Sequence, residues 1–142
     1  MNDWKADLGR FFEETRETRE KQKVSEMDNF IVSVALPAFE QIRIELAKYG
    51  REVTVRSSGS SAALIVLRGG EEEMTYRIQG RTFPNGVLPY AEVRSRERKG
   101  LKLVRAESMF RSGAPDYSIT DVTTDEIIRN FLSHYTRRVK PE

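Results

Sequence analysis

The stretch EEMTYRIQGRTFPNGVLPYAEVRSRERKGLKLVRAESMFR, residues 72–111, decides the fold of this chain of 142 residues. It contains three runs in which apolar and polar residues alternate, as they do in strands with one buried face. The dipeptides Asn85-Gly86 and Lys99-Gly100 separate the runs, and Asn-Gly readily supplies the positive φ values of a tight hairpin turn. The stretch therefore predicts three antiparallel strands, over residues 72–83, 87–98 and 101–111.

Two further strand-like runs precede this stretch. Residues 51–57 alternate around Val53 and Val55, and residues 62–68 are almost continuously apolar. A Ser/Gly turn over residues 57–61 joins these two runs, and Gly69-Gly70 leads into the next strand. Because all the connections are short, the five strands should pair in sequence order as an antiparallel meander.

The two turns within residues 72–111 predict a register. A two-residue turn at Asn85-Gly86 pairs Ile78 with Val93, and a two-residue turn at Lys99-Gly100 pairs Val93 with Ala106. The two turns thus agree on one core row. A slip of one residue would move all three side chains to the opposite face of the sheet.

The opposite face of the predicted sheet carries an unusual set of side chains. The same register places Arg77, Arg94 and Arg105 side by side, where like charges repel unless acids, an anion or a partner surface lie near. Strand alternation and the Gly69-Gly70 turn add further residues to this face, namely Arg96, Arg98, Leu101, Leu103, Leu64 and Val66. A solvated face of an antiparallel sheet should be uniformly polar, and this mixture of arginine and aliphatic side chains is not.

Two interpretations of the mixed face are open at this point. In the first, Glu92 and Glu107 neutralise the arginines diagonally, and the N-terminal helix covers Leu64 and Val66. In the second, the face or its projecting hairpin binds a partner. Arginine beside apolar side chains is typical of protein interfaces, in which lysine and glutamate are depleted.

Helical periodicity precedes the strands. Trp4, Leu8, Phe11 and Phe12 have the spacing of one helix face, whereas residues 13–23 contain no apolar residue. The second segment is either a solvated helix that continues the first, with the tip packed against the domain, or a flexible charged linker. We therefore divide the chain into an N-terminal helical arm, residues 1–23, and a single α+β domain, residues 24–142.

Two more helices complete the predicted fold. Apolar residues return at helical spacing over residues 24–49, where Pro37 predicts a kink, or a break with Pro37 in the first turn of a new helix. Thr123 and Glu126 have the spacing of a capping box that opens a helix over residues 124–139. We expect an α+β fold in which both helices pack on the same face of a five-stranded antiparallel meander.

Composition limits the classes of function. The 24 basic and 22 acidic residues leave a net charge of +2, whereas dedicated nucleic-acid binders usually show a stronger basic footprint. The chain has no cysteine and one histidine, His134, which argues against a transition-metal site. We expect His134 at the surface or half-buried, no cofactor, no membrane partner and a cytoplasmic location.

Motifs for catalysis are missing from the sequence. No paired acids, nucleophile–base pair or glycine fingerprint stands out, so no catalytic, cofactor-binding or metal-binding residue is assigned. The leading hypothesis is a non-enzymatic protein–protein interaction module of adaptor, chaperone-like or regulatory type that self-associates, with a dimer favoured. Its candidate partner-binding surface comprises Arg77, Arg94, Arg96, Arg98, Leu101, Leu103, Arg105, Leu64 and Val66.

Two alternative classes compete with this hypothesis. The first is a nucleic-acid-binding domain with a basic hairpin formed by Arg77, Arg94, Arg96, Arg98 and Arg105. Sheets that bind single strands usually also present stacked aromatic side chains, and here the face offers only Tyr90. The second is a small-ligand-binding or enzymatic domain, which would need a pocket between the helices and the sheet.

Overall fold

An antiparallel sheet of five strands in the order β1-β2-β3-β4-β5 forms the frame of the protein, as the sequence predicts. The computed structural model describes residues 3–84, 86–96, 103–111 and 116–139. The strands are β1 (Glu52–Ser58), β2 (Ser61–Arg68), β3 (Glu71–Phe83), β4 (Gly86–Arg96) and β5 (Leu103–Met109). The helices are α1 (Trp4–Phe30), the π-helical turn η1 (Ile31–Ala35), α2 (Leu36–Ala47), the short 3-10 helix η2 (Ile119–Asp121) and α3 (Thr124–Arg138).

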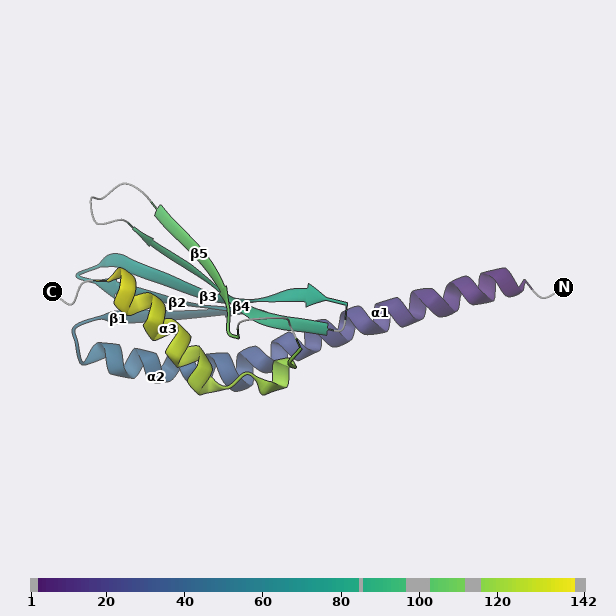
Figure 1. Ribbon diagram of the computed structural model, residues 1–142, viewed down its shortest axis with the longest axis horizontal. Coiled ribbons are helices and arrows are strands. Elements are labelled where there is room, and N and C mark those ends of the chain that lie inside the picture. Colours follow the sequence, from purple (N-terminus) through teal and green to yellow (C-terminus); the bar gives the residue numbers. More distant parts are fainter. Residues whose placement is uncertain (1–2, 85, 97–102, 112–115, 140–142) are drawn as a thin grey trace.

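The helices lie on one face of the sheet and enclose the core (Figure 1). Tyr76 of β3 contacts Phe39 of α2 and Phe131 of α3 edge to face, with ring centroids 6.0 and 5.4 Å apart. All three rings are fully buried. Such contacts contribute roughly 0.5–1.5 kcal/mol each beyond the burial of apolar area. The predicted packing of both helices on the same sheet face is confirmed.

The helical segment before the sheet runs from α1 through η1 into α2 without a break in the helix. Pro37 lies in the first turn of α2, as one of the two predicted arrangements has it, but a π-helical turn stands in place of the expected break. Proline has no backbone N–H and its ring would clash with the carbonyl four residues earlier. The π-helical turn accommodates this, and the N–H of Leu36 donates to Ile31 O, five residues back. Gly50, with φ at +78°, follows the helix end.

The start of α3 follows its prediction. The hydroxyl of Thr123 accepts from the N–H of Glu126, and the carboxylate of Glu126 accepts from the N–H of Thr123. Val122 and Ile127 are both buried and frame this capping box. Arg137 and Arg138 lie in the last turn, where cations favour the helix dipole.

The register of the central strands departs in part from the prediction. Val93 pairs with Ala106 as expected, but Ile78 pairs with Ala91 rather than with Val93. The cause is that Phe83 pairs with Gly86, so that Pro84 lies in the turn, one residue earlier than predicted. Proline cannot donate to a strand ladder, which favours this placement. The predicted turn residues Asn85, Lys99 and Gly100 lie outside the described residues.

A bulge between β2 and β3 changes the sheet face on which Leu64 and Val66 lie. Arg68 pairs with Glu71 as expected, but the register shifts by one residue beyond Leu67. Leu64 therefore pairs with Tyr76 and Val66 with Met74, and both side chains are fully buried in the core. The predicted placement of Leu64 and Val66 on the opposite sheet face is wrong, because one extra residue in β3 reverses the faces.

The N-terminal segment is helical throughout and leaves the body of the protein. Figure 1 shows α1 extending past the end of the β3–β4 hairpin. Trp4, Leu8, Phe11 and Phe12 remain 64%, 49%, 61% and 62% exposed, so the tip does not pack against the domain. Within the described part of the chain, no helix combines the length and apolar character needed to span a membrane.

Candidate interaction surfaces

The sheet face away from the helices is organised around one buried carboxylate. Glu92 of β4 is only 4% exposed, although no described helix covers this face. It accepts hydrogen bonds from Arg94 Nε at 3.1 Å and from Arg105 Nη2 at 2.7 Å. The hydrogen bond from Arg105 is the main cause that holds the pKa of Glu92 below its ordinary value.

The predicted row of three arginines does not form. Arg94 pairs with Arg105 as expected, but the two-residue shift places Arg77 opposite Glu92. The shift thus brings an acid to the place where a like charge was predicted. On the same face Arg81 donates to Glu107, with 2.9 Å between Nη2 and Oε2. The interpretation in which acids neutralise the arginines therefore describes this face well.

The remaining residues of the predicted partner-binding surface do not all lie together on this face. Leu103 is 54% exposed at the start of β5, whereas Arg98, Leu101 and the side chain of Arg96 lie outside the described residues. Alternation along β2 replaces Leu64 and Val66 by Ile65 and Leu67, which are half-buried. No local pattern in the sequence marks the bulge that makes this exchange.

The ion pairs also bear on the nucleic-acid alternative. Glu92 occupies the guanidinium groups of Arg94 and Arg105, so a phosphate would have to compete with a carboxylate that is already in place. Arg81 is likewise paired and also lies over the ring of Tyr90, 4.4 Å from its centroid. The face is therefore less available to an anion than its number of arginines indicates.

A second polar cluster lies under α3. Tyr76 Oη donates to Asn130 Oδ1 at 2.6 Å, and Asn130 Nδ2 donates to Ser108 Oγ at 3.2 Å. Ser108 Oγ lies 3.0 Å from His134 Nε2, and Arg138 Nη1 lies 2.8 Å from His134 Nδ1. The expectation of a surface or half-buried His134 is wrong, because only 7% of this residue is exposed.

The partner on Nδ1 decides what the Ser108–His134 pair can do. A guanidinium can only donate, so Nδ1 is the acceptor and the neutral ring carries its proton on Nε2. Nε2 then donates to Ser108 and cannot take its proton, the opposite of a serine nucleophile with a histidine base. Burial is the main cause that lowers the pKa of His134, and the charges of Arg138 and Arg137 add to it. The cluster is a structural network.

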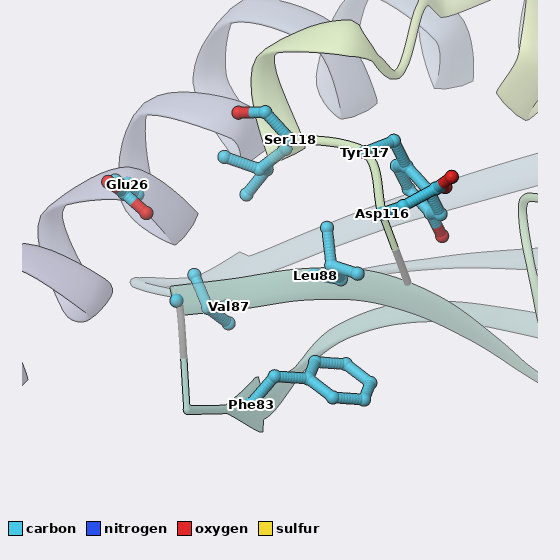
Figure 2. A pocket seen from close by; sticks show the side chains of 9 residues that line it. Glu26, Phe83, Val87, Leu88, Asp116, Tyr117 and Ser118 are labelled. Atoms are coloured by element: carbon cyan, nitrogen blue, oxygen red, sulfur yellow. The ribbon is translucent and has the colours of Figure 1, made fainter. Parts of the chain in front are cut away.

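The described surface contains shallow grooves. One groove of about 330 Å³ lies between α1, the β3–β4 hairpin and the segment before η2, and Figure 2 shows its lining side chains. Glu26 comes from the helix and Asp116 from the segment before η2, on different sides of the groove. The space between helices and sheet, which a small-ligand site would need, is filled by Ile31, Phe39, Ile42 and Phe131.

A second groove, of about 350 Å³, is mostly apolar and lies between α2 and α3, with Leu46, Tyr49, Ile128 and Leu132 in its lining.

Among the described residues, no three histidine, aspartate or glutamate side chains are grouped so as to hold a metal ion. Comparison of the chain with protein-family models, with curated proteins and with solved structures found no match.

Proposed function

We propose that this chain is a self-associating protein–protein interaction module whose docking element is the exposed N-terminal part of α1. One observation carries the proposal. Four large apolar side chains gather at the end of a helix that extends away from the body, and each is about half exposed or more: Trp4, Leu8, Phe11 and Phe12. Contiguous apolar surface of this kind is typical of an interaction site.

The chemistry of the tip supports docking. Tryptophan and phenylalanine are enriched at the centres of protein interfaces, where they contribute most of the binding free energy. An amphipathic helix that presents such residues at helical spacing is a common recognition element. The sheet face around Glu92, with its paired arginines, supports a docking role less strongly than the helix tip does.

Sedimentation equilibrium over a range from low to high micromolar concentration tests the proposal. We expect the wild-type chain to associate, with a dimer as the main species. The double variant Trp4→Ser/Phe11→Ser should be monomeric over the same range, since it removes two of the four apolar side chains without touching the core.

A matched control removes apolar side chains elsewhere on the helices. Val32 and Ile44 are 66% and 50% exposed, and the variant Val32→Ser/Ile44→Ser should associate as the wild type does. Thermal unfolding followed by circular dichroism should show that both variants keep a folded body. A wild-type chain that is monomeric at high micromolar concentration would overturn the proposal.

A further inference from the structure

The projecting part of α1 carries a continuous uncharged seam. Trp4, Leu8, Phe11, Thr15, Thr18 and Gln22 follow one another at intervals of four, three, four, three and four residues. This is the spacing of the a and d positions of a coiled coil. Eight of the eleven residues 13–23 are charged, and the three uncharged ones all fall on this seam. The seam thus extends well beyond the apolar tip.

We infer that residues 4–22 of α1 pair with the same segment of a second copy as a parallel two-stranded coiled coil. The inference rests on the proposed function and specifies its partner and its orientation. The seam is open to such a partner, because its side chains are exposed apart from Thr15, which is half-buried. The hairpin tip at Pro84 lies beside the seam, at a groove that is lined by Arg16 and Lys23 and also by the seam residues Phe11 and Thr15.

The two threonines of the seam can be buried without loss of a hydrogen bond. Thr15 Oγ1 donates to Phe11 O and Thr18 Oγ1 donates to Glu14 O, each at 2.9 Å. Their hydroxyl groups therefore have partners within the same helix, so that a partner helix would leave no unsatisfied donor behind. Gln22 occupies the last a position of the seam, and a polar residue at an a position is a known means to fix register and oligomeric state.

The charges that flank the seam favour the parallel orientation. Glu14 and Arg19 occupy g and e positions, and a parallel pair brings Glu14 next to Arg19 of the partner subunit. An antiparallel pair would bring Glu14 against Glu14 of the partner subunit and Lys5 against Arg19 of the partner subunit, which are like charges, and Asp7 against Lys21 of the partner subunit, which are opposite charges. The repulsive contacts outnumber the attractive ones in that arrangement, so the charges favour the parallel orientation.

The ion pairs within α1 leave Glu14 and Arg19 available for contacts with a second helix. The ion pairs Glu13–Arg16, 2.7 Å apart, and Glu20–Lys23, 3.7 Å apart, do not involve residues of the seam. Among the described residues, Glu14 and Arg19 are not found in an ion pair. Most of the stability of a helix in a protein comes from packing of its apolar face, and a second helix would supply that packing here.

Disulfide cross-linking tests the arrangement, because the chain contains no cysteine of its own. We expect Leu8→Cys and Thr18→Cys, each oxidised alone, to form a dimer through the same residue in both copies. A mixture of the two variants should give no disulfide between positions 8 and 18, which lie about 15 Å apart along a parallel helix pair. Ala6→Cys, on the outward side of α1, is the matched control and should cross-link only weakly.

Each other outcome has a definite meaning. A disulfide between positions 8 and 18 in the mixture would show an antiparallel pair and overturn the inference. A disulfide between Leu8→Cys and Leu132→Cys would place the tip in the α2–α3 groove of the second copy, and would also overturn it. In both cases self-association persists and the proposed function stands, whereas a monomer in sedimentation would remove the proposed function itself.

Discussion

Tyr135 on α3 donates its phenolic hydroxyl to the carboxylate of Glu73 on β3, with 2.6 Å between the two oxygens. Glu73 is the residue that the bulge leaves without a partner across the β2–β3 ladder. Arg51, the residue before β1, donates to the same carboxylate from Nη2 at 3.1 Å. One acidic side chain thus connects the last helix, the bulge and the first strand.

Removal of the Tyr135 hydroxyl should therefore destabilise the fold. We expect Tyr135→Phe to lower the free energy of unfolding by about 1.5–3 kcal/mol, the usual range for a hydrogen bond to a charged group. Urea unfolding, followed by far-ultraviolet circular dichroism, measures the change. Tyr49→Phe, at a site that is 69% exposed, is the control and should unfold like the wild type. Equal stability of the two variants would contradict the assigned role of Glu73.

The same tyrosine predicts a loss of stability at alkaline pH. Burial, and secondarily the nearby Glu73, raise the pKa of Tyr135 from 10.0 to about 12 in the folded protein. The folded state thus disfavours the tyrosinate, so stability is retained below pH 10 and falls as the pH rises towards 12. Tyr135→Phe should show a smaller fall over this interval than the wild type does, when urea midpoints are compared.

Glu92 should stabilise the outer sheet face in a salt-dependent way. In the variant Glu92→Gln, the guanidinium groups of Arg94 and Arg105 lose their shared carboxylate and face each other across the strands. We expect a lower urea midpoint than that of the wild type at low ionic strength, and a difference that shrinks as salt screens the repulsion. Glu107→Gln, which removes an exposed pair with Arg81, should have little effect.

His134 predicts a loss of stability at mildly acidic pH. Its lowered pKa means that the folded protein favours the neutral ring, so the stability is full above pH 6.5 and declines as the pH falls below that value. His134→Gln retains a donor for Ser108 without a titrating group, and its urea midpoint should vary less between pH 7.5 and pH 5.5. Because the chain has a single histidine, its ring signals in an NMR titration report the pKa directly.

The sequence was sufficient for the elements and for part of the register. The capping box at Thr123, the helix stop at Gly50 and the pairing of Val93 with Ala106 depend on local patterns that the sequence displays. Which side chains of β2 point into the core does not follow from local patterns. This depends on a bulge whose extra residue, Glu73, is held by Tyr135, which lies 62 positions away in the chain. No short-range pattern encodes such a contact.

The candidate surface shows the same division. The exposed stripe at Trp4 and Phe11 is visible as helical spacing, whereas the pairing of Arg77 with Glu92 depends on a turn that begins at Pro84. A two-residue shift preserves the sheet faces and is therefore invisible to hydrophobic patterning, although it changes every neighbour on the face. The hydrogen-bond partner of His134, Ser108, likewise lies on another element, the strand β5.

Two glycines provide a paired test of how α1 meets the sheet. A Cβ at Gly80 would lie 2.8 Å from Met27 of α1 and 2.8 Å from Val87 of β4. We therefore expect Gly80→Ala to destabilise the fold by about 1–3 kcal/mol, as overpacking usually does. A Cβ at Gly9 would meet nothing within 4 Å, so Gly9→Ala should instead raise the helical content of α1. Circular dichroism and urea unfolding measure both effects.

Charge reversal distinguishes the two orientations of a paired α1. In a parallel pair, Glu14→Lys turns two attractive contacts with Arg19 of the partner subunit into repulsive ones, and the dissociation constant should rise roughly tenfold. The double variant Glu14→Lys/Arg19→Glu restores opposite charges and should associate nearly as the wild type does. In an antiparallel pair Glu14→Lys replaces one like-charge contact by another, and Arg19→Glu alone would strengthen association by attracting Lys5. Sedimentation of the three variants, with Glu17→Lys on the outward side as the control, separates these outcomes.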